Sequence, residues 1–130
     1  MKKSILLALA LVAACSGNTF DVDVDPESAS VAIDVFSGRP NPTFQLSAAE
    51  GAALEERLSD LSRSGRDAPD AKLGYRGFIV AQGETRVHVG KGVVVYERGT
   101  EREVYEDRHN AEAYLIQIAK QRGYGNVIGR

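Results

Sequence analysis

The chain has 130 residues, which is the length of a single domain. Apolar residues make up 43% and charged residues 26%, a balance that is typical of globular proteins and excludes a wholly disordered chain. The formal net charge of −2 excludes the dense basic face that non-specific nucleic-acid binding requires, so we expect no nucleic-acid partner.

The first predicted element is a secretory leader over residues 1–14. Lys2 and Lys3 give it a basic start, and an unbroken apolar run follows from Ile5 to Ala14. As a helix this run would be about 15 Å long, half of the roughly 30 Å of a bilayer's hydrocarbon core. The run is therefore too short for a stable membrane span and is typical of a segment that is removed after export.

The leader ends in Val12-Ala13-Ala14-Cys15, which resembles a lipobox, the signature of bacterial lipoproteins. The resemblance implies that the Cys15 thiol receives diacylglycerol and that the leader is cut before this residue. Cys15 is the only cysteine, so it has no disulfide partner within the chain, and lipid attachment accounts for a lone thiol in an exported protein. The alternative is an ordinary leader that is cut nearby. In a host with two membranes, the absence of an acidic residue at Ser16 implies the outer membrane.

Residues 15–30 are predicted to form a flexible tether behind the lipid. Asp21, Asp23, Asp25 and Glu27 are evenly spaced in this segment, and like charges favour an extended, solvated chain. A calcium site is the alternative, because calcium is bound by several carboxylates. No EF-hand spacing accompanies these residues, so we expect a spacer and no metal.

A single domain is predicted over residues 31–130. The β-branched, alternating residues 31–36 indicate a strand, and a loop with two prolines and a glycine follows at residues 37–42. Residues 43–46 indicate a second short strand. Ser47 and Glu50 have the spacing of a capping box, which indicates a helix with three leucines on one face, Leu54, Leu58 and Leu61.

After a polar connection at residues 63–72, the pattern predicts an antiparallel meander of four strands, at residues 78–82, 85–89, 93–97 and 102–105. Asp107 is expected to cap a closing helix that ends at Gly123. The order of strands and helices predicts an α+β fold, in which the first strand and the meander form a single antiparallel sheet with two helices packed on one face.

The sequence gives little sign of catalytic or metal chemistry. His88 is placed beside Arg86 on one face of its strand, and His109 in the first turn of the closing helix. Neither has a histidine or cysteine at ligand spacing, so we expect no zinc and no cofactor, and we interpret both as exposed surface residues. No nucleophile motif is present, and nothing pairs the acidic residues at a recognisable spacing.

Two stiff segments are the candidate binding residues. Arg39 and Asn41 lie in Ser37-Gly38-Arg39-Pro40-Asn41-Pro42, and Tyr75 and Arg76 lie in Leu73-Gly74-Tyr75-Arg76-Gly77. One hypothesis is that these four residues converge on one binding edge, since a guanidinium and an amide on a rigid loop suit a carboxylate or a partner's backbone. The interpretation that we favour is that each turn has the residues its backbone requires, with Arg39 bonded to Asp34 or another carboxylate. The two segments together resemble small exported bacterial proteins of unknown role.

Three functions remain open. The first is a membrane-anchored, non-catalytic module that binds a protein or glycan of the cell envelope. The second is a small envelope enzyme that uses carboxylates, with His109 as a possible participant. The third is a structural lipoprotein that pairs through a sheet edge. A concave site with shifted pKa values would favour an enzyme, a patch around Arg39 and Tyr75 a binder, and an uncovered edge strand a pairing protein.

Overall fold

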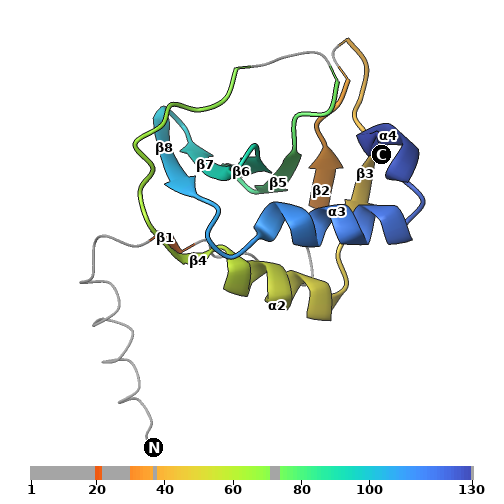
Figure 1. Ribbon diagram of the computed structural model, residues 1–130, viewed down its shortest axis with the longest axis horizontal. Helices are drawn as coiled ribbons and strands as arrows, with labels where there is room; N and C mark the ends of the chain where they lie inside the picture. The colour runs from red at the N-terminus through yellow and green to blue at the C-terminus, as the bar shows by residue number, and fades with distance from the viewer. Residues whose placement is uncertain (1–19, 22–29, 37, 71–73, 130) are drawn as a thin grey trace, which may run out of the picture.

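The computed structural model describes residues 20–21, 30–36, 38–70 and 74–129. They form an α+β fold around one antiparallel sheet of six strands in the order β3-β2-β5-β6-β7-β8 (Figure 1). The strands of this sheet are β2 Ser30–Ile33, β3 Thr43–Gln45, β5 Phe78–Gln82, β6 Thr85–Gly90, β7 Val93–Arg98 and β8 Glu101–Glu106. The predicted fold class and the four-stranded meander are confirmed.

The register of the meander decides which side chains share a face. Ile79, His88, Val95 and Val104 stand opposite one another across β5 to β8. Because side chains alternate along a strand, the next row, from Val80 through Val87 to Tyr96, points to the other face. The sheet therefore has two faces of different composition, and only one of them is covered by helices.

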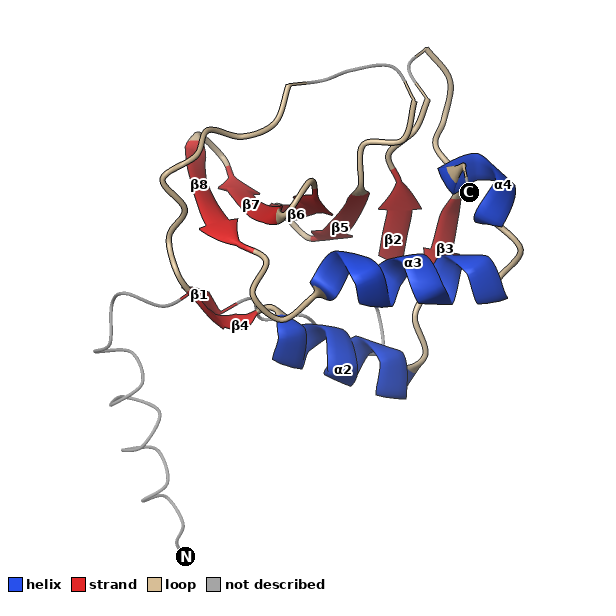
Figure 2. Cartoon of the chain, in the orientation of Figure 1, coloured by secondary structure: helices blue, strands red, loops and turns tan. Residues whose placement is uncertain are grey.

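The helices α2 (Ala48–Arg57) and α3 (Ala111–Gln121) pack on the same face of the sheet, as Figure 2 shows. Together with that face they enclose the core, whose largest fully buried side chains are Phe78, Ile33, Leu54, Leu58, Leu61 and Leu115. Burying one such side chain contributes about 1.5–3 kcal/mol. A one-turn helix, α4 (Gly125–Ile128), follows Gly123, which ends α3 with a φ of 92°.

The two helix starts differ in how they are capped. At α2 the predicted capping box is present, because Ser47 Oγ accepts from the Glu50 N–H and a Glu50 carboxylate oxygen accepts from the Ser47 N–H. At α3 Asp107 caps the helix as predicted, although it does not occupy the N-cap position. The N-cap residue is Asn110 in the left-handed conformation, and Asp107 accepts from the N–H groups of Ala111 and Glu112 from further upstream. His109 consequently precedes the helix, contrary to the prediction.

A small second sheet joins β1 (Phe20–Asp21) to β4 (Ser59–Leu61), a strand that the sequence did not indicate. Its first strand lies inside the segment predicted to be a tether, residues 15–30. The predicted leader and the lipobox with Cys15 lie outside the described residues. So do the acidic residues of the predicted tether other than Asp21. Among the residues that the structure describes, no helix is long and apolar enough to cross a membrane.

One edge of the large sheet is covered, and two backbone carbonyls of the other edge are occupied. Residues 62–64 run antiparallel along β8, where the Ser64 N–H donates to Val104 and the Glu106 N–H donates to Ser62. On the opposite edge, the Arg122 guanidinium donates to the Gln45 carbonyl at 2.9 Å and the Tyr124 hydroxyl to the Thr43 carbonyl at 3.5 Å. These contacts occupy backbone groups that a pairing strand from another chain would need.

Candidate functional site

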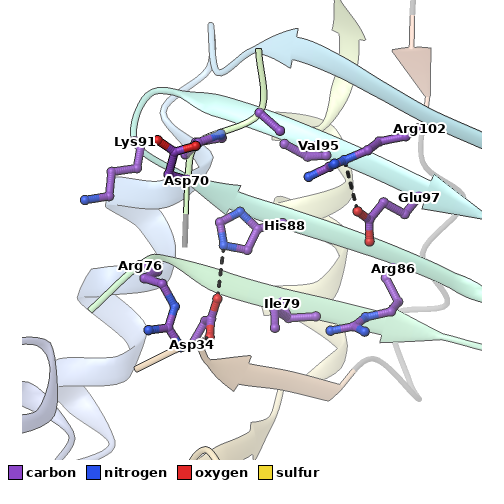
Figure 3. A pocket seen from close by; sticks show the side chains of 12 residues that line it. Asp34, Asp70, Arg76, Ile79, Arg86, His88, Lys91, Val95, Glu97 and Arg102 are labelled. Carbon is purple, nitrogen blue, oxygen red and sulfur yellow. Dashed lines mark hydrogen bonds and ion pairs between the residues drawn. The ribbon is translucent and has the colours of Figure 1, made fainter. Parts of the chain in front are cut away.

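The face of the sheet opposite the helices carries a hollow of about 190 Å³, which we call the open-face hollow. Residues 68–70, which lie between β4 and β5 in the chain, form one wall of it, and the chain just after β2 and just before β5 closes one end (Figures 1 and 3). The apolar residues of its lining are Ala68, Pro69, Ile79 and Val95. The larger, charged and polar part consists of Asp34, Asp70, Arg76, Arg86, His88, Lys91, Glu97 and Arg102.

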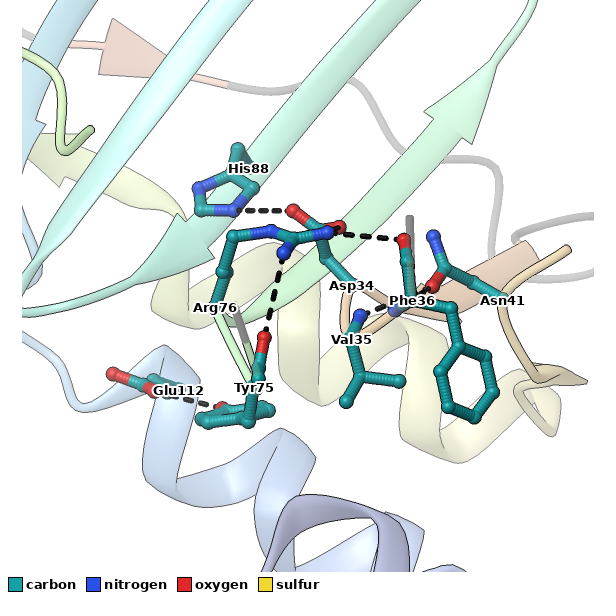
Figure 4. A network of polar contacts seen from close by, with 9 residues as sticks. Asp34, Val35, Phe36, Asn41, Tyr75, Arg76, His88 and Glu112 are labelled. Atoms are coloured by element: carbon teal, nitrogen blue, oxygen red, sulfur yellow. Dashed lines mark hydrogen bonds and ion pairs between the residues drawn. The ribbon is translucent and has the colours of Figure 1, made fainter. Parts of the chain in front are cut away.

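At one end of the hollow, Asp34 is shared between two basic side chains. Arg76 Nη2 donates to Asp34 Oδ1 at 2.9 Å, and His88 Nε2 lies 3.4 Å from Asp34 Oδ2. Arg76 also donates to the Phe36 carbonyl at 3.1 Å, as Figure 4 shows. Only 13% of the Arg76 side chain and 17% of the Asp34 side chain are exposed, so this ion pair is held in place by its surroundings.

His88 is the one histidine in the hollow, and its side chain is only 24% exposed. The prediction of an exposed surface residue is therefore wrong for His88, although its placement beside Arg86 and opposite its valine neighbours is correct. Burial lowers the pKa of His88, while the Asp34 carboxylate raises it by a smaller amount. His88 is accordingly neutral at pH 7 and offers both a donor and an acceptor nitrogen.

Because the pKa of His88 is lower in the folded protein than its ordinary value of about 6.5, the unfolded chain binds the proton first as the pH falls. This histidine's contribution to stability is complete above about pH 6.5 and is lost as the pH falls toward its folded pKa. We expect the melting temperature to drop more steeply between pH 7 and pH 5 in the wild type than in His88→Gln. Parallel slopes in the two proteins would contradict this assignment.

The other end of the hollow is more open. Arg102 Nε lies 3.2 Å from Glu97 Oε2, and both side chains are substantially exposed. Arg86 stands opposite Glu97 in the register of β6 and β7. Lys91 occupies the turn between these strands and lies at the Asp34 end of the hollow. Among the described residues, neither Arg86 nor Lys91 forms an ion pair. In Figure 3 they lie on opposite sides of His88.

The predicted site residues Arg39 and Asn41 make different kinds of contact. Asn41 Oδ1 accepts from the backbone N–H groups of Val35 and Phe36, at 3.0 and 2.7 Å, and so closes the loop on itself. Arg39 is exposed, and its guanidinium lies 3.8 Å from the centre of the Phe36 ring. The expected bond from Arg39 to Asp34 is absent, because Arg76 takes that place.

The second predicted pair divides between the two faces of the sheet. Tyr75 packs edge-on against Phe78 in the core, and its hydroxyl donates to Glu112 of α3 at 2.7 Å. Burial and this carboxylate raise the pKa of Tyr75. Arg76 points the other way, into the hollow. The four predicted residues are therefore neighbours around residues 34–36, but only Arg76 lines the open-face hollow.

This division predicts unequal effects on stability. Asn41→Ala leaves two N–H groups without their acceptor, so we expect it to destabilise the domain by about 1–3 kcal/mol. Arg39→Ala removes an exposed cation–π contact, so we expect a loss of less than about 1 kcal/mol. Urea unfolding of the two variants measures the difference. An equal or larger loss for Arg39→Ala would mean that Arg39, and not Asn41, holds the loop.

The rest of the described chain offers little else for chemistry. A second depression, between the end of α2 and the turn before α3, is lined by Ala53, Glu56, Arg57, Ser59, Asp60 and His109. The His109 carbonyl accepts from Arg57 there, at 2.8 Å. No group of three or more histidine, cysteine or acidic side chains among the described residues is arranged to hold a metal ion.

The fold and the hollow together define a class of protein, a small α+β domain with a charged recess on the open face of one antiparallel sheet. No protein-family model, curated protein or solved structure matches the chain.

Proposed function

We propose that this protein is an exported lipoprotein, anchored in the cell envelope by lipid on Cys15, whose domain is a non-catalytic binding module for an envelope protein or glycan. The open-face hollow is the binding site. Anchoring follows from the short leader and its single cysteine, and from the resemblance of Val12-Ala13-Ala14-Cys15 to a lipobox. In a host with two membranes, Ser16 favours the outer membrane.

The observation that carries the binding proposal is the convergence of charged groups from separate parts of the chain on one recess. Asp34, Arg76 and His88 come from three segments and are fixed by mutual contacts before any ligand arrives. Such preorganised groups lose little entropy on binding. The volume of about 190 Å³ is below the roughly 300 Å³ at which pockets for drug-sized molecules begin, so the hollow suits a single side chain or sugar unit of a larger partner.

Two observations count against pairing through a sheet edge. The β8 edge is covered by residues 62–64, and outward carbonyls of β3 are bound by Arg122 and Tyr124. An edge in this condition offers few free backbone groups to another strand.

One observation favours the enzyme as a second candidate. The contact between Asp34 and His88 has the form of a general base oriented by a carboxylate. However, Arg76 neutralises the same carboxylate, and the described lining holds no serine, threonine or cysteine that His88 could activate. A ligand that is chemically altered on incubation with the wild type, but not with His88→Gln, would establish the enzyme in place of the binding module.

The binding module can be tested in intact host cells by photocrosslinking. A photoreactive amino acid replaces Ala68 in the wall of the hollow, and a control chain carries it at Ala113, an exposed position on α3. We expect a discrete adduct from position 68 only, and its mass fragments distinguish a protein from a glycan. Adduct formation should be lost when Arg86→Gln is added. Equal labelling from both positions, or an adduct indifferent to Arg86, would count against the hollow as the binding site.

A further inference from the structure

We infer that the open-face hollow recognises a threonine side chain of a protein partner, whose hydroxyl donates to His88 Nδ1. This inference rests on the proposed binding function and names the class of partner for the same site. It starts from the two ring nitrogens of His88, which lines the hollow at the centre of the row formed by Ile79, His88 and Val95 across β5 to β7.

One nitrogen of His88 is already engaged. Nε2 lies 3.4 Å from the Asp34 carboxylate, which accepts the single N–H of a neutral imidazole. That contact fixes the tautomer, so Nδ1 carries a lone pair and is a hydrogen-bond acceptor. The two ring nitrogens point in different directions, and in Figure 3 the second one points away from Asp34. Among the described residues, no donor is bonded to Nδ1.

The burial of His88 makes this acceptor decisive for a ligand. Because the side chain is only 24% exposed, a partner that covers the hollow either donates to Nδ1 or leaves it buried without a hydrogen bond. A buried acceptor without a partner is unfavourable, so a group with a donor at this point is selected over a group of the same shape without one.

The charges of the lining favour an uncharged donor. Arg76 binds the Asp34 carboxylate at 2.9 Å, and Arg102 lies 3.2 Å from Glu97. Across the whole lining, four cations stand against three carboxylates. The ammonium or guanidinium group of a partner would therefore enter a recess with an excess of positive charge, whereas a hydroxyl supplies the donor without that repulsion.

The neighbours of His88 favour threonine over a sugar. Ile79 and Val95 stand directly opposite His88, so an aliphatic side chain lies on each side of the imidazole. Threonine carries one hydroxyl and one methyl on the same carbon, so its methyl can contact Ile79 or Val95 while its hydroxyl meets Nδ1. A sugar brings several hydroxyls, and those placed against aliphatic side chains would lose their hydrogen bonds to water. The described lining also contains no aromatic ring on which a sugar could stack.

The test uses the full chain, labelled with ¹⁵N-histidine and kept in a non-ionic detergent, and follows the His88 nitrogens by NMR as probes are added. The probes are acetyl-Ala-Thr-Ala-amide, its isostere acetyl-Ala-Val-Ala-amide, and methyl glucoside as a sugar. We expect Nδ1 to be unprotonated at pH 7, and the threonine peptide to bind about fivefold or more tightly than either other probe. A proton on Nδ1, or equal affinity for the two peptides, would overturn the inference. Tighter binding of methyl glucoside would overturn it in favour of a glycan.

Two variants, followed through their backbone amides, show whether the peptide occupies the hollow. His88→Gln keeps an amide that can reach Asp34 but has no acceptor at the place of Nδ1, so it should bind the threonine and valine peptides equally. His109→Gln is the matched control, because it changes a histidine outside the hollow, and it should keep the preference for threonine.

A preference for threonine that survives in His88→Gln would overturn the inference. The measurements on the wild type decide the question even if His88→Gln fails to fold. If the two peptides bind the wild type equally while position 68 still captures a partner in cells, the binding module stands and only the threonine is refuted. Loss of that capture would refute the binding module itself.

Discussion

A Cys15→Ala chain should accumulate as full-length precursor without lipid, the all-or-none effect expected if Cys15 is the acylated residue. In the processing that we propose, the Cys15 sulfur receives the diacylglycerol, and the chain has no other cysteine to replace it. Each buried CH₂ of an acyl chain contributes about 0.8 kcal/mol to membrane binding, so the loss of two chains removes the anchor. Intact mass spectrometry of the membrane and soluble fractions measures both the cleavage and the added lipid.

Ser16→Ala is the matched control for this experiment, because it changes the neighbouring residue and leaves the thiol in place. It should be cleaved and acylated like the wild type. A wild-type protein whose mature form begins at another residue, or carries no added hydrocarbon mass, would refute the lipoprotein and with it the location in the envelope. The binding properties of the hollow would be untouched by that outcome.

Gly90→Ala is expected to destabilise the domain strongly. The chain just before β5 passes so close to the end of β6 that a Cβ on Gly90 would lie 2.6 Å from the Arg76 carbonyl oxygen and 2.8 Å from the Gly77 Cα. These are backbone atoms, which cannot rotate away as a side chain would. We expect a loss of at least about 3 kcal/mol, at the upper end of the range for overpacking.

The same substitution should also disturb the hollow, since Arg76 and Lys91 flank the two glycines. Gly65→Ala is the control, because a Cβ there meets nothing within 4 Å and the backbone φ is not in the left-handed region. That variant should be neutral or slightly stabilising through the unfolded chain. Urea unfolding of both proteins measures the difference. Equal midpoints would mean that the backbone segments at Gly77 and Gly90 can move apart without a loss of stability.

The local patterns of the sequence were enough to predict most of the fold. The hairpin of β5 and β6, the capping box at Ser47 and Glu50, and the alternation along β5 to β8 each depend on residues that are close in the chain. The first strand was predicted to run to residue 36, but it leaves the ladder after Ile33. Its last residues instead bond to Asn41, which is five residues away, and to Arg76, a contact that no local pattern contains.

The site was harder to predict, because it is built from contacts that are distant in the sequence. Asp34 and Arg76 are 42 residues apart, and nothing in either segment indicates that they pair. Arg86 and His88 were correctly placed on one face of their strand, which was the available signal. What remained hidden was the wall formed by residues 68–70, which turns an exposed sheet face into a recess and buries the imidazole.

The condition of the sheet edges has a consequence under the lipid anchoring that we propose. Anchoring confines many copies to a thin layer, where each meets its neighbours far more often than it would in free solution. At such a local concentration, one uncovered edge strand would be enough to start strand pairing from copy to copy. Residues 62–64 cover the β8 edge, and Arg122 and Tyr124 bind two carbonyls of β3, so both edges offer fewer free backbone groups for pairing between copies under the anchoring that we propose.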